Sequence, residues 1–168
     1  MKSINKCIKV LVRLICTSIA KKQLKSYGKG LRVNFPCRFT KQTIIGKNCN
    51  FNGMTISGKG TVKIGDNFHS GKECLVMTSI HNYDEGETIP YDKSYITKDV
   101  IIRDNVWIGR RVIILSGVTI EEGAIIQAGS VVVKDIPYCA IAGGHPAKVF
   151  QYRNIEHYEK LKRQEKFH

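Results

Sequence analysis

The stretch Ile102–Pro137 decides the fold of this chain, because it divides into blocks of six residues. In order, the blocks are IRDNVW (102–107), IGRRVI (108–113), ILSGVT (114–119), IEEGAI (120–125), IQAGSV (126–131) and VVKDIP (132–137). A β-branched aliphatic residue opens each block, and the fifth residue of the block is small or branched. No helix has a period of six, whereas a parallel β-helix built from hexapeptide repeats does. We therefore expect three blocks per coil, with the first residue of each block in the core.

The same six-residue step occurs upstream, at Val33, Phe39, Ile45 and Phe51. The register slips near Ile56, resumes at Ile64 and is lost between about residues 81 and 99. An interruption bounded by strands in register predicts a loop that protrudes over about 82–99, and a long loop is uncommon without a function. A set of ordinary antiparallel hairpins is the alternative, but six successive matches disfavour it.

The length of 168 residues and the 42% hydrophobic content fit one domain with its own core. No apolar run is long enough to span a bilayer. We expect an N-terminal cap over 1–30, a β-helix over 31–149 and a C-terminal helical segment over 150–168. Helices are expected only near 3–22 and 154–166. Asn154 is the expected N-cap of the second helix, with Ile155, Tyr158 and Leu161 facing the protein.

The net charge of +13 belongs to the N-terminal part of the chain. Residues 1–65 hold fourteen Lys or Arg and no Asp or Glu, whereas the charges of residues 66–168 nearly balance. Three interpretations remain open, namely a solvated basic end, contact with an anionic membrane surface, and contact with a polyanionic substrate. Nucleic acid is not an expected partner, because this end has no recognised binding motif and few stacking aromatics.

A basic amphipathic helix is predicted over residues 2–22. One face carries Ile4, Ile8, Leu11, Ile15 and Ile19, and another carries Lys2, Lys6, Lys9 and Arg13. Such a helix can lie on a membrane interface, cap the open end of a β-helix or associate with a second copy. Capping or self-association is slightly favoured, and neither excludes membrane contact.

Cysteine spacing and the N-terminal sequence indicate a cytoplasmic protein, which the basic end would place at the inner face of the cytoplasmic membrane. The six cysteines show no CxxC or zinc-finger spacing, so we interpret them as reduced, mostly buried thiols. The N-terminal apolar positions are interrupted by basic residues and do not resemble a signal peptide. No metal is expected.

His81 is the main catalytic candidate, because it opens the predicted loop directly after the strand Leu75–Ile80. Groups that act in catalysis tend to lie where a rigid scaffold meets a loop. Histidine also has the right unperturbed pKa to take a proton from a hydroxyl at neutral pH. Asp84 or a backbone carbonyl is the expected partner that orients the imidazole, and Asn82, Tyr83 and Asp84 are candidate acceptor contacts.

Four segments carry a resemblance to a known family: NVWIG (105–109), GVTI (117–120), AGSVVVKDIP (128–137) and AGGHPAKV (142–149). Together they resemble the hexapeptide-repeat acyltransferases over roughly residues 31–153. The most similar branch contains galactoside, maltose, xenobiotic and streptogramin acetyltransferases and the sugar O-acetyltransferases of capsule and lipopolysaccharide clusters. The resemblance implies an all-β, left-handed parallel β-helix. It also implies a homotrimer with active sites between subunits, and acetyl-CoA as the donor.

The resemblance also assigns residues by position. His81 matches the catalytic histidine of the family, Trp107 the tryptophan beside the pantetheine channel, and Asn52 an acceptor contact. Contacts to CoA are implied for Arg110, Ala128, Val133, Lys134 and Lys148. The chain departs from the pattern at Val133, where threonine is frequent, and at Gly144-His145-Pro146, where Gly-Asn-Pro is usual.

The expected function is acetyl-CoA-dependent O-acetylation of a sugar or of a surface-polysaccharide precursor. Acetylation of an antibiotic hydroxyl and N-acetylation of a sugar are the alternatives within the family. A γ-type carbonic anhydrase shares the fold, but it needs zinc-binding histidines on neighbouring strands, and His69 and His81 alone do not make that set. A non-catalytic scaffold that binds a membrane or partner leaves the loop unexplained.

Overall fold

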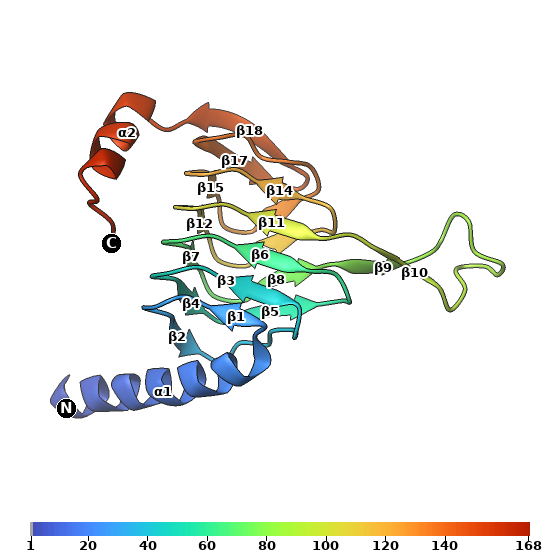
Figure 1. Cartoon of the computed structure of the whole chain (residues 1–168). Coiled ribbons are helices and arrows are strands. Elements are labelled where there is room, and N and C mark those ends of the chain that lie inside the picture. Colours follow the sequence, from blue (N-terminus) through green and yellow to red (C-terminus); the bar gives the residue numbers. More distant parts are fainter. Residues whose placement is uncertain (1) are drawn as a thin grey trace.

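The computed structural model describes residues 2–168 and shows a solenoid whose three sides are parallel β-sheets, with a helix at each end (Figure 1). The chain visits the three sides in a fixed order, and every coil except the first and the last adds one strand to each side. About six coils form in this way. The parallel β-helix predicted from the six-residue repeat is confirmed.

The three sides, here called faces A, B and C, contain nearly all of the strands. Face A contains β1 (Ser26–Tyr27), β3 (Thr43–Ile45), β6 (Val62–Ile64), β11 (Val100–Ile102) and β14 (Thr119–Ile120). Face B contains β2 (Arg32–Phe35), β4 (Asn50–Asn52), β7 (His69–Ser70), β12 (Trp107–Ile108), β15 (Ile125–Ile126), β17 (Ala140–Gly144) and β18 (Ala147–Tyr152). Face C contains β5 (Met54–Ser57), β8 (Cys74–Met77), β13 (Ile113–Ile114) and β16 (Val131–Val132). Only the β17–β18 pair, at the end of face B, is antiparallel within these faces.

The residues that open the repeat blocks form the core, as predicted. None is more than 1% exposed among Ile102, Ile108, Ile114, Ile120, Ile126 and Val132. In the first coils aromatic rings take the place of isoleucine, and Phe51 lies with its ring centroid 5.2 Å from those of both Phe39 and Phe68. All six cysteines are free, and four of them are buried. A continuous apolar column therefore runs through the solenoid.

Asparagines turn the chain from face A to face B in three successive coils. Asn48, Asn67 and Asn105 have φ angles of 51°, 55° and 59°. Asparagine tolerates this left-handed conformation better than most residues, because its short side chain forms local hydrogen bonds. The Nδ2 group of Asn48 donates to Oδ1 of Asn67 at 3.0 Å, and Nδ2 of Asn67 donates to Oδ1 of Asn105 at 2.9 Å. This asparagine ladder (Asn48, Asn67 and Asn105) ties the coils together at one corner.

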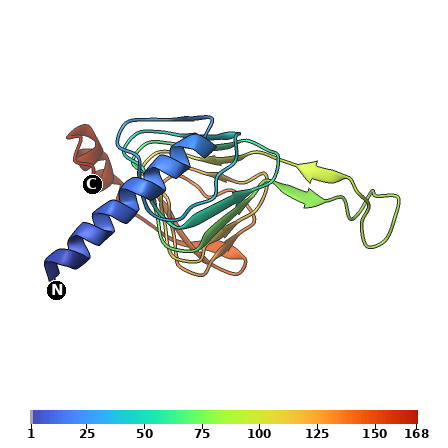
Figure 2. The same cartoon turned by 90° about the horizontal axis from the view of Figure 1, so that it is seen from below.

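Helix α1 (Lys2–Gln23) closes the N-terminal end of the solenoid and lies across β2 (Figures 1 and 2). Its side chains pair backbone N–H groups at the edge of the first coil. Thr17 Oγ1 accepts a hydrogen bond from the Val33 N–H at 3.0 Å, and Gln23 Oε1 accepts one from the Phe39 N–H at 2.7 Å. Such groups are costly to leave unpaired and are a ready template for pairing with another chain. The helix therefore caps the end of the solenoid.

The face of α1 that packs on the solenoid is not its apolar face. Cys16 and Ala20 are buried against the first coil, whereas Ile15 and Ile19 are each 51% exposed. Small side chains allow the helix axis to approach the coil closely, which larger isoleucines would prevent. The side chains of residues 2–6 lie outside the described part, so the packing of Ile4 is not described. No described helix is both long and apolar enough to cross a bilayer.

Helix α2 (Ile155–Arg163) packs back on the solenoid after the last strand (Figure 1). Asn154 is its N-cap as predicted, and Oδ1 of Asn154 accepts from the His157 N–H at 2.9 Å. The predicted contact face is partly wrong, because Ile155 is 44% exposed while Tyr158 and Leu161 are half-buried. Polar contacts anchor the helix instead. Tyr158 OH donates to Glu122 Oε1 at 2.8 Å.

The interruption predicted as a loop over 82–99 is a β-hairpin arm. Strands β9 (Ser79–His81) and β10 (Tyr95–Thr97) pair antiparallel, with Tyr95 opposite His81. Residues 82–94 form the tip, which projects away from the solenoid (Figures 1 and 2). The predicted position of the protrusion is confirmed, but residues 95–97 are strand rather than loop.

Candidate functional site

His81 is the last residue of β9, just beyond the point where the chain leaves face C. The segment before it is fixed by the neighbouring coil, since the buried Thr78 donates through Oγ1 to the Ser57 carbonyl at 2.9 Å. The hairpin is closed beside it by a contact of 2.9 Å between Ser79 Oγ and Thr97 Oγ1. The imidazole therefore stands at the base of the arm, where the rigid scaffold holds it.

Two tyrosines of the hairpin flank the His81 ring. The Tyr91 ring stacks on it with centroids 3.8 Å apart, and the Tyr95 centroid lies 4.5 Å away. The Nδ1 atom of His81 is buried and has no hydrogen-bond partner within the described chain. The predicted orienting bond from Asp84 or from a backbone carbonyl is therefore not formed at Nδ1. Leaving a buried nitrogen without a hydrogen bond costs about 1–3 kcal/mol. A substrate or another chain that supplied a partner for Nδ1 would remove this cost.

The three residues after His81 begin the tip of the arm. Asn82 shapes a turn, because its Oδ1 accepts from the Glu85 N–H at 3.2 Å. Tyr83 is 68% exposed, and Asp84 is also exposed. Further along, hydrogen bonds from Ser94 and from the Glu87 N–H hold the pKa of Asp92 below its usual value. The tip therefore has its own internal bonds, and Tyr83 and Asp84 are free to contact an acceptor.

Asn52 lies apart from the arm, on β4 of face B. Its Oδ1 accepts from Asn34 Nδ2 at 3.0 Å, and its Nδ2 donates to the Ser70 carbonyl at 2.7 Å. The side chain is thus engaged within face B. The structure does not bring Asn52 to His81 in one chain.

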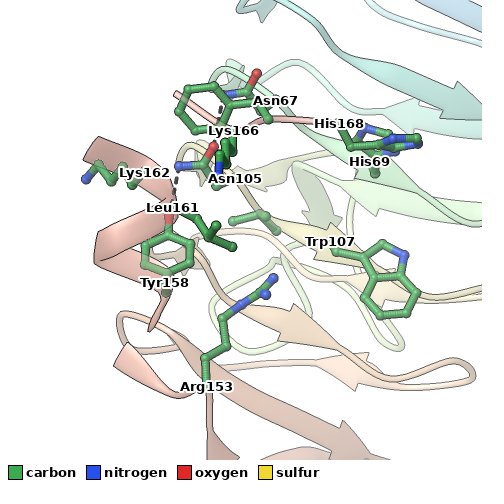
Figure 3. A pocket seen from close by; sticks show the side chains of 12 residues that line it. Asn67, His69, Asn105, Trp107, Arg153, Tyr158, Leu161, Lys162, Lys166 and His168 are labelled. Carbon is green, nitrogen blue, oxygen red and sulfur yellow. Dashed lines mark hydrogen bonds between the residues drawn. The ribbon is translucent and has the colours of Figure 1, made fainter. Parts of the chain in front are cut away.

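Trp107 points outward from β12 on face B and is 53% exposed. It lines a cavity of about 440 Å³ between face B and α2, together with His69, Arg153, Lys162 and Phe167 (Figure 3). Burial and the nearby His168 lower the pKa of His69 below its usual value. The cavity wall combines aromatic rings with cations.

The remaining residues assigned to CoA contact fall on two corners of the solenoid. Arg110, Ala128 and Lys148 lie where face B ends, and Val133 and Lys134 lie where face C turns toward face A. All five are exposed. Successive coils are joined at the first corner by a hydrogen bond of 2.8 Å from the Gly129 N–H to the Arg110 carbonyl. The Arg110 guanidinium lies 3.5 Å from the Glu73 carboxylate, an exposed pair that leaves it accessible to an anion.

His81 and Trp107 lie on different sides of one solenoid. The hairpin arm projects from the side opposite α2, and Trp107 lines the cavity beside α2 (Figure 1). One chain thus presents the assigned base and the assigned tryptophan in two separate places.

The comparisons with known proteins place this geometry in a family. The family described as bacterial transferase hexapeptide (six repeats) matches residues 99–134. A solved galactoside acetyltransferase in complex with coenzyme A is 32% identical with a TM-score of 0.73, and the match covers 84% of this chain and 71% of that one. The chain belongs to the hexapeptide-repeat acetyltransferases.

Other solved hexapeptide-repeat acetyltransferases are similar as well. An acetyltransferase of Vibrio cholerae O1 biovar eltor, complexed with acetyl coenzyme A, is 28% identical with a TM-score of 0.69, and the match covers 80% of this chain and 74% of that one. A maltose O-acetyltransferase of Clostridium difficile 630 is 29% identical with a TM-score of 0.50, over 78% of this chain and 67% of that one. A search among curated proteins found no match. The similarity to these three solved acetyltransferases shows that the chain is an acyltransferase.

Sequence reasoning missed the two tyrosines that enclose the histidine of this hexapeptide-repeat acetyltransferase. Tyr91 and Tyr95 stand in a polar stretch without the six-residue period, so the repeat pattern predicts a loop there and no strand pairing. The alternation Tyr95-Ile96-Thr97 was an available signal, because a strand there pairs with Ser79–His81 and brings Tyr95 opposite the histidine.

Metal ligands are not grouped in the described part of this acetyltransferase. No three His, Cys, Asp or Glu side chains among residues 7–168 lie where they could jointly hold a metal ion. His69 lies on face B, and His81 lies on the hairpin arm. Within one described chain, the zinc set of a γ-type carbonic anhydrase is thus not assembled.

Proposed function

We propose that this protein is an acetyl-CoA-dependent O-acetyltransferase that acts on a hydroxyl of a sugar or surface-polysaccharide precursor, with His81 as the general base. One observation carries the proposal: the His81 imidazole stands at the base of the arm, enclosed by two tyrosines, with a buried nitrogen left unpaired. Galactoside and maltose acetyltransferases, at 32% and 29% identity, support a sugar acceptor over an antibiotic.

The chemistry needs a base, because a sugar hydroxyl is a weak nucleophile at neutral pH. His81 takes the hydroxyl proton while the acceptor oxygen bonds to the acetyl carbon of the thioester. The carbon–sulfur bond breaks, and the imidazolium returns the proton to the departing thiolate of CoA. Backbone N–H groups along the coil edge are the proposed donors to the oxygen that gains negative charge.

The donor is proposed to bind along the coil corners. Trp107 lies beside the pantetheine arm, and Arg110, Lys134 and Lys148 offer charge-assisted hydrogen bonds to the phosphates. Ala128 and Val133 contribute apolar contact, and Val133 lacks the hydroxyl that threonine supplies at this position in the family. Asn52, Asn82, Tyr83 and Asp84 remain the proposed acceptor contacts.

A homotrimer is the proposed working form, with His81 of one subunit facing the donor-binding corner of another. Two observations support it. His81 and Trp107 lie on different sides of one chain, and His81 Nδ1 lacks a partner there. In a closed ring with rotational symmetry, the same contact between the His81 side of one subunit and the donor-binding corner of the next is repeated at every interface. The six cysteines are free, which supports the proposed cytoplasmic location.

The test is acetyl-CoA turnover by His81→Ala against a panel of sugars, nucleotide sugars and lipid-linked glycans. A general base contributes about 10²–10⁴-fold to the rate, so kcat should fall by that factor on the preferred acceptor. His81→Asn should do little better, because an amide cannot accept the proton. The affinity for acetyl-CoA, measured by calorimetry, should stay nearly unchanged.

His145→Ala is the matched control, since His145 is an exposed histidine in the turn between β17 and β18. This variant should raise KM for the donor more than it lowers kcat. If His81→Ala kept most of its turnover while His145→Ala lost it, the base would be assigned to the wrong histidine.

A further inference from the structure

Helix α1 turns an apolar stripe away from the protein. The stripe consists of Ile8 (53% exposed), Leu11 (58%), Ile15 (51%) and Ile19 (51%). Residues on an α-helix follow at roughly 100° intervals, so the centre of the stripe lies well over a quarter turn around the axis from the packed residues Cys16 and Ala20. Figure 2 shows α1 lying across the end of the solenoid, and the exposed fractions place the stripe at the surface of the chain. The cap therefore does not use the most apolar face of its own helix.

Two shallow grooves run along another flank of α1 and share Leu14. The first, about 370 Å³, is lined by Cys7, Val10, Leu11 and Leu14 and is almost wholly apolar. The second, about 350 Å³, is lined by Leu14 and Leu31 together with Arg13, Lys21 and Arg32. Apolar surface thus passes directly into a patch of cations. An acyl chain with an anionic headgroup has this same succession of chemistry.

Charge decides which occupant fits the stripe. Residues 1–65 carry fourteen basic residues and no acidic ones. Pairing through the stripe with the α1 of a second copy would bring two such surfaces together, which like-charge repulsion opposes. An anionic lipid surface matches both the apolar stripe and the positive charge around it.

We propose that α1 docks this enzyme on an anionic lipid bilayer, lying in the interface with the stripe buried among the acyl chains. Lys9, Lys21 and Lys22 are exposed around the helix and can reach phosphate groups at the headgroup level. Because the stripe and the packed residues Cys16 and Ala20 lie on different sides of α1, docking through the stripe leaves the solenoid outside the bilayer. The inference stands apart from the proposed acyl transfer, since lipid binding does not use His81.

The experiment is flotation of the full chain with vesicles of phosphatidylglycerol and phosphatidylcholine, and with phosphatidylcholine alone. The protein should float with the mixed vesicles, and added salt should release it. Neutralising Lys9 or Lys21 with Gln should each weaken binding about fivefold, equivalent to about 1 kcal/mol per basic residue. Leu11→Asp combined with Ile15→Asp should abolish flotation. Because both side chains are exposed, circular dichroism and the melting temperature should stay as in the parent chain.

Phe150→Asp combined with Ile155→Asp is the matched control, because these side chains are 55% and 44% exposed away from α1. This variant should bind the mixed vesicles like the parent. Equal flotation with both vesicle types, or flotation that survives Leu11→Asp with Ile15→Asp, would overturn the proposal. The proposal would also fail if the parent chain did not bind vesicles and the Leu11→Asp, Ile15→Asp variant had a lower oligomeric mass than the parent. That result would assign the stripe to contacts between copies. Turnover of a soluble acceptor, measured in parallel, reports on catalysis separately.

Discussion

At the residue scale, the corner between faces A and B shows why position in a coil matters more than hydrophobicity. Asn67 donates to one neighbour in the ladder and accepts from the other, while its backbone stays at a φ of 55°. The buried Ile108 in the next coil needs only an apolar side chain of the right size. The left-handed φ angle and the two hydrogen bonds thus each limit which residue can replace Asn67.

Replacement of Asn67 separates these two restrictions. Asn67→Ala loses two hydrogen bonds and keeps a Cβ in the left-handed region, so the free energy of unfolding should fall by about 3 kcal/mol. Asn67→Gly loses the same bonds but adopts that φ freely, so it should be about 1 kcal/mol less destabilising. Chemical denaturation of both variants makes the measurement. A glycine variant less stable than the alanine variant would show that the backbone conformation is not a restriction.

The buried residues could be predicted from the sequence, whereas the asparagine ladder could not. Burial follows the local six-residue period, so Ile102 and Ile114 are identified from their own neighbourhood. The ladder joins residues 19 and then 38 apart, because the hairpin arm is inserted between the second and third asparagine. Only the stacking of coils reveals which asparagines meet.

At the element scale, each appended segment departs from its sequence interpretation for its own reason. Periodicity identifies two faces on α1, but close approach to a flat coil end selects the small side chains Cys16 and Ala20. The hairpin arm lacks the six-residue period, so its strand Tyr95–Thr97 carried no repeat signal. Helix α2 is held by Glu122, a residue of the solenoid that its own sequence cannot indicate.

The attachment of α2 should depend on pH through Glu122. Burial raises the pKa of this carboxyl, but hydrogen bonds from Lys162 and Tyr158 outweigh it and hold the pKa below its usual value. A lowered pKa gives stabilisation that is complete above the unfolded value, about 4.3, and that disappears as the pH falls through the lower folded value. The ring signals of Tyr158, followed by NMR, should therefore shift toward those of a free tyrosine as the pH falls below about 4.

Glu122→Gln is the control for this titration. The neutral amide loses the ion pair with Lys162, so α2 should be held more weakly at neutral pH. In this variant the acid dependence of the Tyr158 ring signals should disappear. The same acid transition in parent and variant would assign it to another group.

At the scale of the whole molecule, the solenoid separates the two halves of its proposed site. His81 is placed by the hairpin arm, and Trp107 by face B on the side of α2 (Figures 1 and 3). The resemblance assigns roles to both residues, and the structure places them apart within one chain. The left-handed sense of the coil also came from the resemblance, because a repeat length of six fixes the period and not the hand.

Mixed assemblies test whether the site is shared between copies. Chains that carry His81→Ala lack the proposed base, and chains that carry Trp107→Ala with Lys148→Glu lack proposed donor contacts, so each variant alone should be nearly inactive. If the proposed trimer forms, co-expression should give trimers that contain both chains, and an interface that joins an intact His81 to an intact donor corner should be active. With random mixing in a closed ring, about a quarter of the interfaces pair an intact His81 with an intact donor corner. About a quarter of the parent activity should therefore return. Mixing the two variants after each has assembled should restore nothing, and sedimentation should show three times the chain mass of 18.9 kDa. Co-expressed trimers without activity would place the whole site within one chain.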